Sequence, residues 1–412
     1  MPIYTIYLLG LRLYIKQYKS LAFPPLEAIA AKNICGSSKV ANDVLDHNVN
    51  GDDGPRSYSA SHHPAVRVSL LPGPGLDAMN RVIAKKVVAS ISEIKLEKSV
   101  KLFVFISHEI TIATTDSVKV QPGVMILLLG LFPSVLAAEN GGHLQGSALV
   151  KTRVEHSLEY GIPIEDIARY ETGGALGVLT NTSPSSFWMI LHVYSDELLL
   201  GECRKELAKM VSDNTFVNEK GETKTMRTLD MTSVKTACPI MLSVFQEVLR
   251  TYSVSGSARL VMEDHLLDGK YLLKKGGTLM IPGPVQHTSS DAFGSAAGSF
   301  DHRRFMPGSR THNPVAFRAF GGGTTLCPGR HFATTEILAF TALMILRCDV
   351  KPDSGIWVCP TRDNAGLWES TPMPDFDIGV SIKPRTHTGG NVEWRVLFTD
   401  SDKVIKLSAE DM

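Results

Sequence analysis

The sequence carries no excess of charge of either sign. Its 42 lysines and arginines balance 42 aspartates and glutamates, so the formal net charge at neutral pH is zero. A protein that holds nucleic acid needs a basic surface, and this composition therefore predicts no nucleic-acid partner. Hydrophobic residues make up 43% of the chain. This fraction excludes extensive disorder, because disordered chains combine low hydrophobicity with high net charge.

Cysteine is scarce. Six cysteines occur among 412 residues, and no two of them form a C-x-x-C pair. The spacing therefore predicts neither a zinc module nor a thioredoxin-like redox site. Six cysteines are also far too few for a disulfide scaffold of this length, so we expect a reducing compartment.

Long uninterrupted hydrophobic runs are missing as well. A membrane-spanning helix needs about 20 predominantly apolar residues. The first 16 residues are apolar, but Arg12 interrupts them, and they lack the features of a secretory signal. A second run, residues 124–138, contains Gly130 and Pro133 and is more typical of a buried or membrane-dipping segment than of a span.

Local patterns predict a mainly helical chain with a minor sheet. Helical spacing of apolar residues begins at Leu76. The longest helical signal is at residues 164–210, with Pro184 as its one strong breaker. A last helix, at 330–347, is apolar on most faces and should be buried. Residues 36–76, rich in Gly, Ser, Pro, Asn, Asp and His, are predicted to form loop.

Strand-like segments are short and lie in the second half of the chain. Three of them are bounded by Gly, Asp or Lys, and residues 373–398 alternate in the manner of a hairpin. The three isolated strands are predicted at residues 258–262, 271–273 and 278–281.

The most informative segment is residues 317–340. Three glycines precede Cys327, a proline and a glycine follow it, and then the apolar helix begins. Glycine lets the backbone take a positive φ and approach a flat ligand closely. A thiol just before a helix N-terminus meets unpaired N–H groups and the positive end of the dipole, which favours the thiolate that binds metal. An isolated cysteine is more often structural, but these flanking residues favour a ligand.

This segment resembles the cysteine loop of the cytochrome P450 family, F-x-x-G-x-x-x-C-x-G. The matching positions are Phe320, Gly323, Cys327 and Gly329. Four matches at fixed spacing, followed by a helix, are a specific signal.

Two further motifs of that family precede the loop in the expected order. Glu247 and Arg250 match E-x-x-R, a spacing that puts both side chains on one helix face. Residues 300–305 are similar to F-x-P-x-R-F, with Arg304 as the arginine and His302 at the position of the proline. The chain is thus identified as a member of the family over roughly residues 76–398.

The resemblance implies a mainly α fold, in which a helical domain with a small β-rich subdomain holds haem b between a central helix and the cysteine loop. Cys327 is then the axial iron ligand, whose electron donation favours O–O cleavage. Glu247, Arg250 and Arg304 are implied to be structural. Arg259 is implied to bind a haem propionate through its guanidinium fork, with His287 as a weaker candidate for that role.

Two departures from the family bear on the site. Many members carry Arg or His two residues before the cysteine, where this chain has Thr325. The family's central helix usually carries A-G-x-D/E-T, an acid–alcohol pair that relays protons, but no carboxylate occurs here between Glu171 and Asp196. Asn181 and Thr182, with Ser183, are the candidates for the oxygen side, and Pro184 should open the helix by removing a hydrogen bond.

The stretch around Pro184 resembles the branch that includes prostacyclin synthase, bile-acid hydroxylases and many fungal members. We expect a poorly defined N-terminal segment at residues 1–75, shortened relative to the family, and a haem-binding domain at 76–412. No tryptophan occurs in the first 187 residues, although family members usually place one near the haem.

The function that the resemblance implies is a haem-thiolate monooxygenase acting on a lipophilic small molecule in secondary or lipid metabolism. Electrons are expected from NADPH through a separate reductase, because no nucleotide-binding fingerprint is present. The resemblance also implies association with the endoplasmic-reticulum membrane. Two alternatives stay open: a peroxide isomerase or dehydratase on the same scaffold, and an inactive, truncated remnant.

Overall fold

The computed structural model describes residues 3–5, 20–54, 56–118, 142–309, 314–366, 369–385 and 392–398. Both apolar segments considered above, residues 124–138 and nearly all of 1–16, lie outside these ranges. In the part of the chain that is described, no helix is long and apolar enough to cross a membrane.

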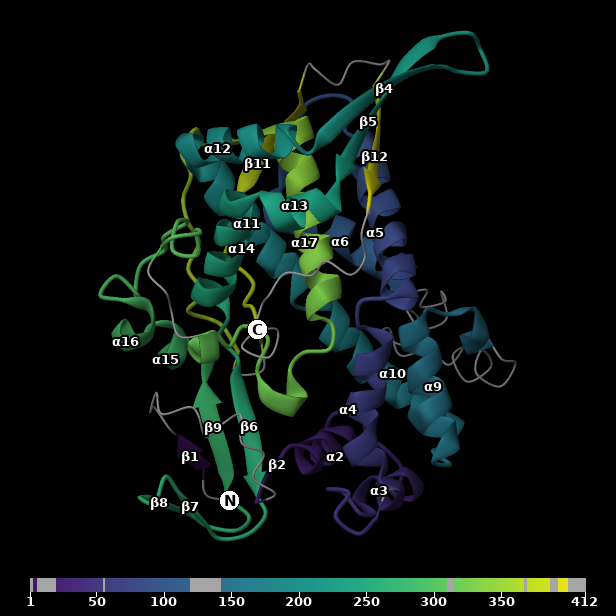
Figure 1. Ribbon diagram of the computed structural model, residues 1–412, viewed down its shortest axis with the longest axis vertical. Coiled ribbons are helices and arrows are strands. Elements are labelled where there is room, and N and C mark those ends of the chain that lie inside the picture. The colour runs from purple at the N-terminus through teal and green to yellow at the C-terminus, as the bar shows by residue number, and fades with distance from the viewer. Residues whose placement is uncertain are drawn as a thin grey trace.

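The core is built around α17 (Arg330–Arg347), which runs down the middle of the molecule in Figure 1. Of its 18 residues, 15 are buried, as the apolar pattern predicted. It packs against α5 (Pro74–Ser92) and α11 (Thr182–Ser195), and α11 in turn packs against α6 (Leu102–Val118) and α14 (Pro239–Tyr252). Helical packing around one buried helix therefore carries most of the fold.

The other helices of the described residues lie around this core. Those of eight or more residues are α2 (Pro24–Asn33), α3 (Lys39–Asp46), α4 (Tyr58–Ser69), α9 (Ala148–Glu159), α10 (Ile164–Leu179) and α12 (Glu197–Ala208). The shorter ones are α13 (Met231–Ala237), α15 (Gly283–His287) and α16 (Ser290–Phe293).

The strands form four small sheets in the described residues. The sheet nearest the start of α17 has the order β1 (Ile3–Thr5), β9 (Thr278–Pro282), β6 (Gly256–Val261), β2 (Leu21–Ala22), as Figure 1 shows at the base of the molecule. A two-stranded sheet pairs β7 (His265–Leu267) with β8 (Tyr271–Leu273). The three isolated strands predicted from the sequence are thus confirmed as β6, β8 and β9.

The predicted C-terminal hairpin is wrong. β11 (Gly379–Pro384) lies between β10 (Cys348–Pro352) and β3 (Lys98–Lys101), whereas β12 (Val392–Leu397) pairs in parallel with β5 (Thr223–Asp230). β5 also pairs with β4 (Val211–Val217). The two alternating runs belong to different sheets because each finds its hydrogen-bonding partner far away in the sequence, which no local pattern reports.

The prediction of loop at residues 36–76 is also wrong, since α3 and α4 lie within it. Ser38 and Ser57 are their N-cap residues, and each side chain accepts a hydrogen bond from a backbone N–H in the first turn. Ala41, Leu45 and Tyr58 are then buried in a second small core. That core includes residues of α9 and α10, so tertiary packing decides the structure of a stretch whose composition favours turns. The division of the chain at residue 75 stays a prediction.

The long helical signal at 164–210 is divided into three helices. α10 ends at Leu179 and α11 begins at Thr182, while Asp196 caps the N-terminus of α12 by accepting from two backbone N–H groups. Pro184 lies in the first turn of α11, where a missing N–H costs no helical hydrogen bond. The helical hydrogen bonding is therefore interrupted between Leu179 and Thr182, before the proline is reached.

Candidate functional site

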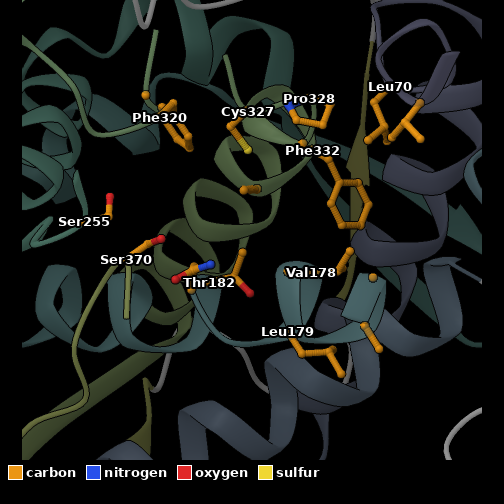
Figure 2. A pocket seen from close by; sticks show the side chains of 18 of the residues that line it. Leu70, Val178, Leu179, Thr182, Ser255, Phe320, Cys327, Pro328, Phe332 and Ser370 are labelled. Carbon is orange, nitrogen blue, oxygen red and sulfur yellow. The ribbon is translucent and has the colours of Figure 1, made fainter. Parts of the chain in front are cut away.

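A cavity of about 640 Å³ lies where the start of α17 meets the junction of α10 and α11. Figure 2 shows Cys327 and Pro328 on one side of it and Thr182 and Leu179 on the other. β6, α4, α6 and α9 also contribute to the wall. Most of the lining is apolar, including Leu70, Val178, Leu179 and Phe332. The cavity thus brings together the cysteine loop and the helix junction that the sequence singled out.

The cysteine loop holds its shape through backbone hydrogen bonds and two left-handed glycines. The N–H of Cys327 donates to the carbonyl of Phe320 at 2.9 Å, which closes the loop. Gly321 and Gly323 have φ of 78° and 70°, a region that strains other residues. A Cβ at Gly329 would meet only Cys327 Sγ, at 4.0 Å, so this glycine keeps the space beside the sulfur open.

The end of α17 favours the thiolate of Cys327, as expected, but it does not decide the net direction of the pKa shift. The N–H groups of Gly329 and Arg330, and the charge of Arg330, do lower the pKa of the thiol. Burial acts more strongly in the opposite direction and raises the pKa of Cys327 above its ordinary value. The local helix end therefore assists metal binding without being sufficient to ionise the sulfur.

Arg259 lies beside the cysteine loop, as a propionate partner requires. Its Nη2 donates to Thr325 Oγ1 at 2.7 Å, and both residues line the cavity. Many family members carry a cationic side chain at the position of Thr325, and here the guanidinium of Arg259 is hydrogen-bonded to that threonine. A thiol facing a cavity, a glycine loop without side chains beside it and a guanidinium at the wall fit the haem that the resemblance implies.

His287 does not belong to this site. It is 1% exposed, and its Nε2 accepts from the backbone N–H of Arg318 at 2.8 Å. Burial lowers the pKa of His287 to about 3, so it is neutral. Among the described residues His287 is not part of the cavity lining, and the idea that it binds a propionate is wrong because it serves a buried backbone contact instead.

Glu247, Arg250 and Arg304 form one buried cluster. Arg250 donates from Nε and Nη2 to the two oxygens of Glu247, both at 2.7 Å, and Arg304 Nε lies 3.1 Å from each oxygen. The arginines also donate to the backbone carbonyls of residues 287, 293, 296, 297 and 299. The cluster ties α14 to the segment that leads into the cysteine loop and does not touch the cavity.

Thr182 and Asn181 both line the cavity at the start of α11. Asn181 Oδ1 accepts a long hydrogen bond, 3.4 Å, from the N–H of Thr371, which also lines the cavity, and so helps to hold the adjoining part of the wall. The hydroxyl of Thr182 is buried and has no aligned hydrogen-bond partner. Of the two residues, Thr182 is the one with a hydroxyl available to exchange a proton.

Glu336 is a buried acid close to Thr182 that the sequence analysis did not identify. It lies on α17 and is fully buried, and Thr114 Oγ1 donates to its Oε1 at 2.5 Å. Burial raises the pKa of Glu336 to about 8, with smaller opposing contributions from the hydroxyls of Thr114 and Thr182. Its Oε2 has no aligned partner. The available signal was a single acidic residue inside an otherwise apolar helix.

Comparison with known proteins agrees with these motifs. The model of the family "Cytochrome P450" matches residues 175–373. The cytochrome P450 monooxygenase nodJ of Hypoxylon pulicicidum is 30% identical, over 95% of this chain and 82% of its own length. A cytochrome P450 monooxygenase of Gibberella zeae is 30% identical over 51% of this chain and 41% of its own. Cytochrome P450 7A1 of Oryctolagus cuniculus is 26% identical over 49% of this chain and 43% of its own.

Proposed function

Because this chain belongs to the cytochrome P450 family, we propose that it inserts one oxygen atom from O2 into a lipophilic small molecule. The observation that carries the proposal is the position of Cys327, which lines a largely apolar cavity opposite Thr182. An apolar lining favours a hydrophobic substrate, since it offers little to compensate the lost hydration of a strongly polar one.

Cys327 would hold the haem iron through its sulfur, and Arg259 would pair with a propionate. When bound, haem b supplies the iron at which O2 is reduced, with electrons delivered from NADPH by a separate reductase. The left-handed glycines 321 and 323 position the sulfur against the cavity. Phe320 and Phe332, which also line it, would pack against the bound haem and exclude water.

Proton supply is the feature that favours monooxygenation over peroxide isomerisation. With a pKa near 8, the carboxyl of Glu336 keeps its proton at neutral pH. It would pass that proton from Oε2 to the buried hydroxyl of Thr182, a residue of the cavity lining, and Thr114 would orient the carboxyl through Oε1. An acid on α17 would thereby serve in place of the acid that the central helix lacks. An isomerase needs no such relay.

The experiment that tests the proposal is the carbon monoxide difference spectrum of the reduced protein. A strongly red-shifted Soret band that disappears in Cys327→Ala is expected. Absence of haem, or a band typical of non-thiolate haem, would refute the proposal and favour the inactive remnant. Turnover of a peroxide without reductase would favour the isomerase. From the family resemblance we also propose a role in secondary or lipid metabolism and association with the endoplasmic-reticulum membrane.

A further inference from the structure

The cavity has a second polar end away from Cys327. Among the described residues that line it, Arg153, Glu171 and Arg259 are the charged ones. Arg259 lies by the cysteine loop, whereas Arg153 of α9 and Glu171 of α10 form their own ion pair, with Nε and Oε1 2.7 Å apart. Glu171 lies on α10, about two helical turns before that helix ends at Leu179, and Thr182 begins the next helix, α11. The pair therefore faces the part of a bound molecule that is remote from the reacting carbon.

This ion pair is held in place but keeps surface for a ligand. Arg153 Nη2 also donates to the carbonyl of Tyr170 at 2.9 Å, which fixes the plane of the guanidinium. The side chains of Arg153 and Glu171 are still 14% and 18% exposed. Because both line the cavity, this residual surface includes the part that a substrate can reach.

Glycines on α10 make room for the pair. A Cβ at Gly174 would lie 2.4 Å from Arg153 Nη2 and 2.6 Å from its Cζ, so any other residue there would displace the guanidinium. Gly173 and Gly177 line the cavity from the same helix. Glycine is unfavourable in a helix interior, and at position 174 the close approach of Arg153 explains why it is present.

The charges at this end balance. Arg153 contributes a positive charge and Glu171 a negative one, while burial raises the pKa of nearby Glu27 to about 7, so that it adds only partial charge. An anionic ligand would meet the carboxylate of Glu171, and a cationic one would meet Arg153. A hydroxyl or carbonyl group meets N–H donors and carboxylate acceptors together without introducing a charge.

We propose that the Arg153–Glu171 pair binds an uncharged polar group, a hydroxyl or carbonyl, at the end of an otherwise apolar substrate that lies away from Cys327. This inference rests on the proposed function and narrows its substrate class to neutral lipophilic molecules with a polar group at one end.

Calorimetric titration of the haem-loaded protein with three twelve-carbon probes tests the proposal. The probes are 1-dodecanol, dodecanoate and dodecyltrimethylammonium, with the alcohol below its solubility limit and the two ions below their micelle-forming concentrations. The wild type is expected to bind the alcohol at least about tenfold more tightly than either ion. Arg153→Met should weaken alcohol binding by about 10- to 100-fold, because it removes a hydrogen bond to a charged group. Glu171→Gln should shift the preference to dodecanoate, since Arg153 then lacks its counter-charge.

Two glycine variants provide a matched pair in which Arg153 itself is kept. Gly174→Ala should weaken alcohol binding as Arg153→Met does, because the new methyl group displaces the guanidinium. Gly201→Ala, on α12 and outside the cavity lining among the described residues, has nothing within 4 Å of its Cβ and should bind as the wild type. Gly174→Ala keeps the test decisive if Arg153→Met does not fold.

The proposal is overturned if the wild type prefers either ion, or if Gly174→Ala and Arg153→Met bind all three probes as the wild type does. The carbon monoxide spectrum of each variant separates this result from failure of the proposed function. An intact thiolate band with altered probe preference supports the polar end, whereas an intact band with unaltered preference overturns the polar end alone.

Discussion

Replacing Glu247 with glutamine should destabilise the protein far more than the same change at an exposed ion pair. Glu247 is 0% exposed and is the carboxylate that both Arg250 and Arg304 contact. Its removal leaves two guanidinium groups without a counter-charge at a buried position, and breaking a buried pair in this way costs about 3–5 kcal/mol.

The corresponding change in melting temperature follows from the length of the chain. Unfolding entropy is about 2.1 cal/mol/K per residue, so for 412 residues each kcal/mol lowers the Tm by about 1 °C. We therefore expect Glu247→Gln to lower the Tm by about 3–6 °C. Scanning calorimetry of the haem-loaded protein, checked by urea unfolding, measures this difference.

Glu202→Gln is the matched control. Glu202 pairs with Arg303, the neighbour of Arg304, but the two side chains are 35% and 52% exposed. Water and salt screen such a pair, which contributes about 0–1 kcal/mol, so its Tm should change by about 1 °C or less. If Glu247→Gln lowers the Tm no more than Glu202→Gln does, the cluster does not hold α14 to the cysteine-loop segment and the reasoning is refuted.

Three further changes test the site. The raised pKa of Glu336 means that the folded state keeps a proton that the unfolded chain loses above about pH 4.5, so this group should make stability fall as pH rises towards about 8. Glu336→Gln should remove that decline, and an equal fall of the unfolding free energy between about pH 5 and 8 in both proteins, measured by urea unfolding at each pH, would contradict it. Gly323→Ala places a side chain at φ 70°, so it should lower the free energy of unfolding by about 1–2 kcal/mol and weaken haem binding. Gly201→Ala, where a Cβ would have nothing within 4 Å, should not destabilise the protein. Equal unfolding midpoints for the two variants would argue against strain in the loop. Arg259→Met should speed haem transfer to apomyoglobin several-fold with the thiolate band unchanged, and unaltered transfer would exclude Arg259 as a propionate partner.

Local sequence determined those parts of the protein whose causes lie close together in the chain. The cysteine loop needs glycines at set distances from Cys327, and E-x-x-R needs two side chains on one helix face. The burial of the apolar helix at 330–347 was predictable because apolar residues cover most faces of the helix, whereas a helix at the protein surface is apolar on one face only. The strands β6, β8 and β9 were found for the same reason, since short apolar runs bounded by turn residues are local features.

Tertiary structure decided the features that depend on contacts between distant residues. Thr114 and Glu336, 222 positions apart, share a hydrogen bond, and only that proximity shows that an acid lies near Thr182. Helix α3 forms within turn-rich sequence because Ala41 and Leu45 are buried beside α9 and α10. Burial also raises the pKa of Cys327, although the N–H groups at the start of α17 lower it. Desolvation and long-range pairing are properties of the packed chain, so no reading of spacing and composition reports them.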